Sequence, residues 1–380
     1  MNIVIIGWYG TETIGDRAIL AGLFHAFSQA YGRISIKIGC LDTLLTERTI
    51  LEDYDFFLRC SKNKLNLVSL FDSRRITELD NAIKWGDIVV IGGGPLMEIE
   101  ALYMLCYAFE KAKILGRKTV AAGCGMGPFK TERLLRLAVD IINLSDVTVF
   151  RDSKSKELYE SYSKSKHNNC FASIDPASFA SQCYRDLNEN GMPFLNNDYI
   201  AVNFREPPKS EYAGLYDLGD EYFVNMLKSI SKTYSTNIHL VPMHTFWLGD
   251  DDRFMLNRIC RKVALPNVFV YNKPLSLEQT MNVFSNARCC YGMRFHAVLL
   301  QTILNGRNVV LDYTDPQKGK IANLLNQFDL MESYKERYVS LVTRPFIPLN
   351  CDMTTKTDIS KDIIDCFEDI YIKCFINLVS

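Results

Sequence analysis

Short β-branched segments that run directly into glycine-rich turns recur along the chain, and this pattern constrains the fold most strongly. Ile3–Ile6 leads into a turn containing Gly7 and Gly10, and Ile88–Ile91 leads into Gly92–Gly94. Apolar residues at helical spacing follow these turns, so strand, turn and helix alternate. Because this alternation builds parallel sheets covered by helices, the sequence predicts an α/β fold with doubly wound sheets.

The length and the position of one polar segment predict two such domains. A chain of 380 residues is long enough for two Rossmann-sized domains. The alternation runs through residues 1–182, stops in a polar stretch without periodicity at 183–198, and resumes over 199–345. We therefore expect Rossmann-like domains over 1–182 and 199–345 with a linker at 183–198. The helical segment within 346–380 is a candidate to cross back to the first domain.

Composition excludes several classes of protein. A formal net charge of −1 gives no support for a nucleic-acid partner or a broadly basic membrane-binding surface. The 12 cysteines form no CxxC pair, and the adjacent Cys289 and Cys290 have no partner at zinc-ligand spacing. The start of the sequence lacks the pattern of a signal peptide, and no apolar run reaches the ~18 residues of a membrane span. We therefore expect a cytoplasmic protein with reduced cysteines.

The segment from 291 to 313 contains the strongest candidate site. A turn at Gly292 leads to Arg294 and His296, and an apolar helix pattern follows. A helix N-terminus favours anions, arginine binds carboxylate or phosphate through two hydrogen bonds, and histidine exchanges a proton near neutral pH. The segment therefore predicts an anion site with a proton-transfer group. The alternative is a surface arginine beside a core histidine.

Other polar residues follow strands of the second domain. Arg205 lies at a strand end, and Lys320 or, less favoured, Lys318 opens a later helix. His244 follows another strand and is either a second proton-transfer group or a histidine fixed in its own loop. The acids Asp250–Asp252 resemble metal ligands, but they precede a helix whose N-terminus favours negative charge, and we expect no metal.

Glycines and polar residues follow the strands of the first domain. Ligands of open α/β sheets bind at the carboxyl ends of the strands, where glycine lets the backbone approach them. The pattern is neither GxGxxG nor a Walker loop, so it specifies neither NAD nor ATP. The alternative is a set of tight turns with Asp16 as a helix N-cap. The candidate residues that line the site here are Tyr9, Gly10, Thr11, Thr13, Asp16, Gly93, Gly94 and Gly125.

The ordered set of motifs resembles the polysaccharide pyruvyl transferase family. The motifs are GWYGTETIGDRAIL, DIVVIGGGPLME, AAGCGMGPF, RDSKS with DPAS, VNFRE, VPMHTFWLGDDD and YGMRFHAVLLQTILNGRNVVLDY. The resemblance implies a GT-B-like architecture, with two Rossmann-like domains facing a cleft. It also implies phosphoenolpyruvate as donor and a pair of sugar hydroxyls as acceptor. The product would be a cyclic pyruvate ketal on a cell-surface polysaccharide or its lipid-linked precursor, with release of phosphate.

The resemblance also assigns roles to residues. It implies that Arg294 and His296 bind the donor and act in catalysis, and no cofactor is required. From the chemistry of the donor we add Arg205 and Lys320 as further anion-binding groups and His244 as a second proton-transfer candidate. Thr13 stands where the family often has asparagine, which makes the acceptor the least defined feature.

Three other functions remain open. A GT-B glycosyltransferase that uses a nucleotide sugar would have the same fold, although the Arg-x-His helix start suits a small dianion. A glycan-binding relative without catalytic activity is the second alternative. A nicotinamide-dependent dehydrogenase is disfavoured because GxGxxG is missing. A polyprenyl-linked acceptor would require peripheral association with the inner face of the membrane.

Overall fold

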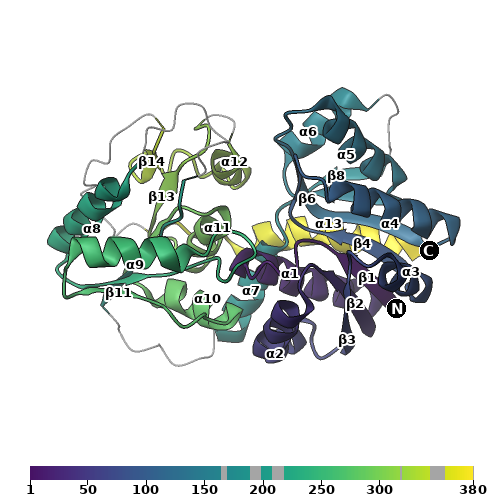
Figure 1. Ribbon diagram of the computed structural model, residues 1–380, viewed down its shortest axis with the longest axis horizontal. Helices are drawn as coiled ribbons and strands as arrows, with labels where there is room; N and C mark the ends of the chain where they lie inside the picture. The colour runs from purple at the N-terminus through teal and green to yellow at the C-terminus, as the bar shows by residue number, and fades with distance from the viewer. Residues whose placement is uncertain (164–168, 189–197, 208–217, 317–318, 343–355, 380) are drawn as a thin grey trace. The chain divides into compact units, whose positions relative to one another are not determined.

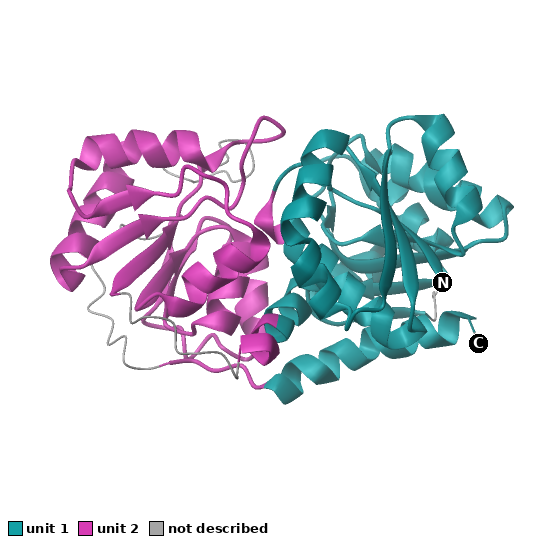
Figure 2. Cartoon of the chain, turned by 90° about the horizontal axis from the view of Figure 1, so that it is seen from below, with its two compact units in different colours: residues 1–12, 16–183, 361–380 teal, residues 13–15, 184–360 magenta. Residues whose placement is uncertain are grey.

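The computed structural model describes residues 1–163, 169–188, 198–207, 218–316, 319–342 and 356–379. The chain forms two compact units, coloured separately in Figure 2. Unit 1 comprises residues 1–12, 16–183 and 361–380, and unit 2 comprises residues 13–15 and 184–360. Each unit contains its own parallel sheet with helices around it (Figure 1).

The sheet of unit 1 is parallel, with the strand order β3-β2-β1-β4-β6-β7-β8, and β5 pairs with β6. Its central strands are buried on both faces, which explains why they are continuous apolar runs rather than alternating ones. The strands are β1 (Asn2–Ile6), β2 (Ile34–Cys40), β3 (Leu65–Asp72), β4 (Ile88–Gly92), β5 (Pro95–Leu96), β6 (Lys118–Met126), β7 (Val147–Phe150) and β8 (Cys170–Ala172).

Helices of unit 1 bury their apolar sides against this sheet. Residues of α3, α4 and α5 share one core with β1, β4 and β6. The Phe27 ring of α1 stacks on Phe375 of α13 with ring centroids 4.5 Å apart. The helices are α1 (Ile14–Tyr31), α2 (Thr43–Cys60), α3 (Ile76–Trp85), α4 (Leu102–Ile114), α5 (Glu132–Leu144), α6 (Ser153–Tyr162), α7 (Ala177–Asn188) and α13 (Lys361–Val379).

The sheet of unit 2 is also parallel and has the order β11-β10-β9-β12-β13-β14, which is the 3-2-1-4-5-6 order of a Rossmann fold. Its strands are β9 (Tyr199–Asn203), β10 (Asn237–Leu240), β11 (Val268–Val270), β12 (Cys289–Gly292), β13 (Asn308–Asp312) and β14 (Tyr338–Ser340). Its helices are α8 (Asp220–Tyr234), α9 (Asp252–Val263), α10 (Leu277–Asn286), α11 (Phe295–Leu304) and α12 (Lys320–Gln327).

The predicted α/β class with doubly wound parallel sheets is confirmed, but the expected linker at 183–198 is wrong at its start. Residues 183–188 continue α7, while 189–197 lie outside the described residues. Within the expected 346–380 segment, the described helix α13 belongs to unit 1, where Tyr371 donates a hydrogen bond to the Ile174 carbonyl at 2.9 Å. Among the described helices, none is both long enough and apolar enough to cross a membrane.

The expected N-cap role of Asp16 is also wrong, because α1 already begins at Ile14. Asp16 lies in the first helical turn and accepts a hydrogen bond from the Thr11 hydroxyl at 3.1 Å. A carboxylate in the first turn still suits the positive end of the helix dipole.

Candidate active site in unit 2

The site of unit 2 begins where the strand order reverses, between β9 and β12. Asn203 ends β9 opposite Gly292, the last residue of β12. The Asn203 amide donates to the Val241 carbonyl at 3.0 Å, and its Oδ1 accepts the backbone N–H of Arg294 at 3.0 Å. This buried asparagine therefore ties the end of β10 to the residue that precedes α11. Crevices at such a reversal are the usual ligand sites of doubly wound sheets.

Arg294 is held by a carboxylate from a neighbouring loop. Its Nε lies 2.8 Å from Asp252 Oδ2 and its Nη2 lies 2.5 Å from Asp252 Oδ1. Burial lowers the pKa of Arg294, but the Asp252 carboxylate more than offsets this, so the pKa is raised and the guanidinium stays charged. Nη1 makes no hydrogen bond within the described part of the chain. The ion pair therefore fixes the guanidinium and leaves N–H groups for a ligand.

Asp252 is itself fixed by the backbone of the loop after β10. Its Oδ2 accepts the N–H groups of Met243 and His244 at 3.0 and 3.1 Å, and its side chain is 1% exposed. The adjacent Asp251 caps α9 and binds Arg253 at 2.6 Å. The Arg253 guanidinium therefore lowers the pKa of Asp251 against the effect of burial. These two acids hold arginines and a helix N-terminus, and metal ligation is not needed to explain them.

Two cations, Arg205 and Lys320, lie against the ring of Tyr313, which follows β13. The Arg205 guanidinium lies 5.2 Å from the ring centroid and donates to the phenol oxygen at 3.2 Å, and Lys320 Nζ lies 5.6 Å from the centroid. Burial raises the pKa of Tyr313, but Lys320, Arg205 and Arg294 outweigh it, so the pKa is lowered. We call Arg205, Arg294, Lys320 and Tyr313 the Tyr313 cluster. Lys318, the weaker candidate, lies outside the described residues.

The His296 ring lies against a glycine from the beginning of the chain. A Cβ atom on Gly15 would lie 2.0 Å from His296 Nδ1, so no larger residue fits without moving the ring. The Ile14 N–H donates to the Met243 carbonyl at 2.9 Å, and Thr13 forms an antiparallel bridge with His244. Residues 13–15 belong to unit 2, and Gly15 among them lies against the His296 imidazole.

His244 is held within its own loop. Its Nε2 lies 2.7 Å from the Leu248 carbonyl, so this nitrogen carries the proton. A Cβ on Gly249, whose φ is +103°, would lie 2.2 Å from His244 Cε1. The ring thus stabilises the loop between β10 and α9, which favours the structural alternative over proton transfer.

The predicted residues of unit 1 pack mainly against their own unit. Tyr9 is buried and donates its hydroxyl to the Gly92 carbonyl at 2.8 Å. Gly10, Gly93 and Gly94 have positive φ values of 91°, 71° and 74°, and an added Cβ would meet Asp42, Ile19 and Trp8 respectively. An added Cβ on Gly125 would lie 2.8 Å from Arg151 Nε. Backbone conformation and internal packing therefore explain these glycines, and their contact with a ligand stays a prediction.

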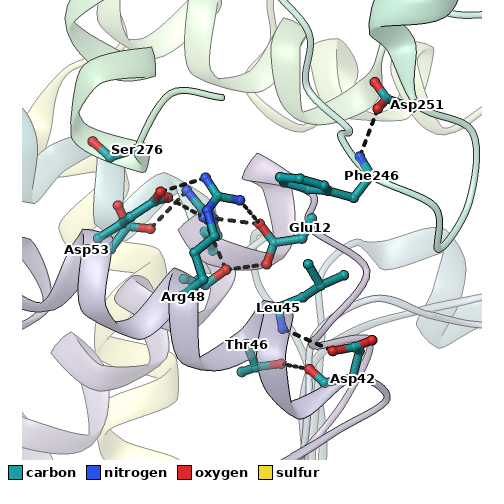
Figure 3. Close-up of polar contacts among 12 residues, drawn as sticks. Glu12, Asp42, Leu45, Thr46, Arg48, Asp53, Phe246, Asp251 and Ser276 are labelled. Atoms are coloured by element: carbon teal, nitrogen blue, oxygen red, sulfur yellow. Dashed lines mark hydrogen bonds and ion pairs between the residues drawn. The ribbon is translucent and has the colours of Figure 1, made fainter. Parts of the chain in front are cut away.

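Unit 1 contains a buried charge cluster that the sequence did not reveal. Glu12, at φ +55°, accepts hydrogen bonds from Thr49 at 2.6 Å, Arg48 at 3.1 Å and Arg17 at 3.3 Å. Arg17 also pairs with Glu52 at 2.9 Å and Asp53 at 3.4 Å. Figure 3 shows Glu12, Arg48 and Asp53 turned towards one another. We call Glu12, Arg17, Arg48, Thr49, Glu52 and Asp53 the Glu12 cluster.

Comparison with known families now identifies the chain. The family model described as polysaccharide pyruvyl transferase matches residues 14–316. The chain belongs to the polysaccharide pyruvyl transferase family. The matched range includes Arg205, Arg294 and Tyr313 of the Tyr313 cluster, and Lys320 lies beyond it. Gly15 and His296 also lie within this range. No curated protein matches the sequence significantly.

Solved structures similar to this pyruvyl transferase family member are GT-B-like UDP-GlcNAc 2-epimerases. The enzyme from Methanocaldococcus jannaschii has a TM-score of 0.59 at 12% identity, covering 97% of this chain and 99% of that chain. The enzyme from Rickettsia bellii has a TM-score of 0.58 at 12% identity, covering 100% and 96%. The enzyme from Neisseria meningitidis, bound to UDP-GlcNAc, has a TM-score of 0.55 at 14% identity, covering 99% and 100%. At these identities the similarity establishes the fold alone.

Several residues of the site in this pyruvyl transferase family member were not singled out from its sequence. Asn203 is the last residue of β9 and Tyr313 directly follows β13, so their place at a strand end, within the motifs VNFRE and LDY, was the available signal. For Asp252 the sequence pattern indicates only a metal ligand or an acid at a helix N-terminus. Its pairing with Arg294 depends on the sheet bringing two loops together. Gly15 was seen as part of a turn, but the ring it contacts lies far along the chain.

Proposed function

We propose that the protein transfers a pyruvate group from phosphoenolpyruvate to a sugar of a cell-surface polysaccharide or its lipid-linked precursor, forming a pyruvate ketal. The observation that carries this proposal is the Tyr313 cluster, in which three cations converge beside the start of α11. Phosphoenolpyruvate has a carboxylate and a phosphate close together, and such an anion suits several convergent cations. The family supports the class of reaction.

The reaction adds two sugar oxygens to one carbon of the donor. The methylene carbon of phosphoenolpyruvate gains a proton, and one sugar hydroxyl loses its proton as its oxygen bonds to C2. A second hydroxyl oxygen then replaces the phosphate at C2, and its proton leaves with the phosphate. The product is a cyclic ketal and inorganic phosphate, and the protons balance without a redox partner or cofactor.

The chain's residues would supply anion binding and proton transfer. Arg294, fixed by Asp252, offers its remaining N–H groups to the carboxylate or phosphate. Arg205 and Lys320 neutralise the other end of the donor. His296, fixed against Gly15, moves a proton either from the attacking hydroxyl or to the departing phosphate. The glycine-rich loops of unit 1 remain the proposed acceptor side.

The direct test is turnover with identified products. The protein is incubated with phosphoenolpyruvate and free or polyprenyl-linked galactosyl and mannosyl acceptors, and phosphate release is measured alongside mass spectrometry of the sugar. A gain of about 70 Da, equal to pyruvic acid added with loss of water, is the expected result of the acid–base chemistry above. The control is His239→Phe, which replaces an imidazole stacked on Tyr199 at 4.5 Å, away from the Tyr313 cluster.

A nucleotide-sugar glycosyltransferase is the competing outcome. Tight binding of a nucleotide sugar, with transfer of a glycosyl group and no phosphate release from phosphoenolpyruvate, would replace the proposed reaction. Glycan binding without either transfer would indicate a relative that binds sugar but does not catalyse.

A further inference from the structure

A pocket with an aromatic wall lies beside the Arg294–Asp252 ion pair in unit 2. Its volume is about 390 Å³, within the range of ~300–1,000 Å³ that ligand pockets usually occupy. Phe246, Trp247 and Phe254 line it together with polar residues of the same loop and of α9. Asp252, whose carboxylate fixes Arg294, is also one of its lining residues. The pocket therefore shares one residue with the candidate active site.

Two large aromatic side chains of this pocket are exposed to solvent. Trp247 is 64% exposed and Phe254 is 77% exposed. Trp247 also meets Phe246 edge-on with ring centroids 5.9 Å apart. Exposed aromatic surface on the wall of a pocket typically marks a binding site, because covering it with a ligand removes apolar area from water.

The loop that carries these rings is held in place by the protein itself. Phe246 has a φ of +70°, which is unusual for a bulky residue, and its N–H donates to Asp251 Oδ2 at 3.0 Å (Figure 3). The Arg253 guanidinium lies 5.0 Å from the centroid of the Phe246 ring and also pairs with Asp251. The aromatic wall is thus organised before any ligand binds, which lowers the entropic cost of binding.

The polar groups of the pocket carry negative rather than positive charge. Glu206 and Asp250 are exposed carboxylates on its lining. The cation there, Arg258, already pairs with Glu206 and with Asp220, both at 2.9 Å. A phosphate or nucleotide would meet carboxylates here, whereas hydroxyl groups can donate hydrogen bonds to them. This charge is opposite to that of the Tyr313 cluster.

We propose that this pocket binds a neutral pyranose ring of the acceptor glycan. The C–H face of the ring lies on Trp247, and its hydroxyls donate to Asp250 and Glu206. The proposal rests on the proposed function for its role, because the pocket then presents an acceptor next to Arg294. Unit 2 would then contact one sugar of the acceptor in addition to the donor, and the different charges of the two surroundings would separate the neutral sugar from the anionic donor.

The proposal is tested by separating acceptor binding from donor binding. Methyl and p-nitrophenyl galactosides and mannosides are titrated by calorimetry into the full-length wild type, Trp247→Ala and Tyr162→Ala. Tyr162 is a similarly exposed aromatic residue at the end of α6 in unit 1 and serves as the matched control. We expect at least a tenfold loss of saccharide affinity in Trp247→Ala and less than a twofold change in Tyr162→Ala. Phosphoenolpyruvate affinity should change less than twofold in both.

A second variant tests the carboxylates without removing aromatic surface. Asp250→Asn should weaken saccharide binding three- to tenfold, and it should not improve phosphoenolpyruvate binding at the Tyr313 cluster by more than twofold. If the protein turns over an acceptor, Trp247→Ala should raise the acceptor KM at least tenfold with a smaller change in kcat. A purely structural role for the loop would lower kcat and the melting temperature together.

The outcomes distinguish this proposal from the proposed function. Saccharide binding that depends on Trp247, without any pyruvyl transfer, supports the pocket and rejects the reaction. Pyruvyl transfer that Trp247→Ala leaves unchanged rejects the pocket and supports the reaction. If Trp247→Ala abolishes nucleotide-sugar binding, the proposed neutral-saccharide site is wrong. The same holds if the wild type binds none of the tested saccharides up to about 10 mM.

Discussion

The Glu12 cluster of unit 1 and the Tyr313 cluster of unit 2 both bury arginine, but they differ in the balance of charge. In the Glu12 cluster, Arg17 and Arg48 face three carboxylates, those of Glu12, Glu52 and Asp53. Each guanidinium is therefore matched by carboxylates of the same unit. With two guanidinium groups against three carboxylates, this network has no unmatched positive charge for an anionic ligand, and its buried members are costly to separate.

In the Tyr313 cluster the cations outnumber the carboxylates that pair with them. Arg294 pairs with Asp252, whereas Arg205 and Lys320 form no ion pair with a carboxylate in the described part of the chain and share the Tyr313 phenol. Excess buried or half-buried positive charge is unfavourable unless an anion completes it. The difference indicates that charge balance, rather than burial of arginine, distinguishes a stabilising network from a candidate binding site.

The largest expected effect concerns catalysis beside the Tyr313 cluster. His296→Ala should lower kcat by about 10²–10⁴-fold, because a positioned acid or base contributes that much. Phosphoenolpyruvate affinity and the melting temperature should change little, since the cations remain. Steady-state kinetics, calorimetry and circular dichroism measure these three quantities. Normal turnover would remove His296 from the mechanism.

The next effect concerns stability in the Glu12 cluster. Arg17→Met should lower the free energy of unfolding by about 3–5 kcal/mol, because it leaves buried carboxylates unpaired. Arg48→Met should cost about 1 kcal/mol or less, since Arg48 is 28% exposed against 5% for Arg17. Urea unfolding measures both. A large loss of phosphoenolpyruvate affinity in either variant would contradict the contrast between the clusters.

A smaller effect should follow from one added methyl group. Gly15→Ala places a Cβ 2.0 Å from His296 Nδ1, so the ring must move while the helix backbone stays compatible with alanine. A displacement of about 1 Å can cost ~10²-fold in rate, so kcat should fall by up to that amount. Gly219→Ala, where an added Cβ meets nothing within 4 Å, is the control. Equal activity of the two variants would show that the ring position is not critical.

The smallest effect is expected for Asp220, a partly buried carboxylate that belongs to neither cluster and therefore gives a reference for both. Arg258 and Lys262 lower the pKa of Asp220 to about 2. Because this folded-state pKa lies below the unfolded value of about 3.9, the stabilisation is complete above pH ~4 and is lost as the pH falls through 2. Asp220→Asn should therefore destabilise by about 1 kcal/mol or less at pH 6 and by less at pH 2.5. Unfolding curves at both pH values test this.

The fold was predictable where hydrophobic pattern and turn residues agreed. The sequence Ser-Leu-Glu-Gln at 276–279 is typical of a capping box, and the structure has that box at the start of α10. An aspartate before a helical segment is typical of an N-cap, and Asp152 caps α6. The sequence of residues 41–84 has no clear periodicity, although this region contains α2, β3 and α3. Part of the reason is that the side of α2 that faces the Glu12 cluster includes charged residues such as Asp53, which obscures the apolar periodicity.

Single residues of the candidate site could be predicted from the sequence, but the side chains that contact them could not. Arg205, Arg294 and His296 follow strand ends, and the sheet places those ends at one edge. The partners Asp252 and Tyr313 could not be assigned, because each contact joins loops far apart in sequence. A cluster with matched charges, such as the Glu12 cluster, and one with excess positive charge, such as the Tyr313 cluster, also look alike in sequence. Both consist of arginines near acidic residues. Only the three-dimensional pairing shows which cations are matched.

The most direct test of the charge contrast is a calorimetric titration of phosphoenolpyruvate into the wild type, the double variant Arg205→Gln with Lys320→Gln, and Arg48→Gln. Each lost charged hydrogen bond is worth about 1.5 kcal/mol or more, so the double variant should bind at least about 100-fold more weakly. Arg48→Gln should bind as the wild type does. Unchanged affinity in the double variant, or an equal loss in Arg48→Gln, would contradict the assignment of the Tyr313 cluster as the donor site.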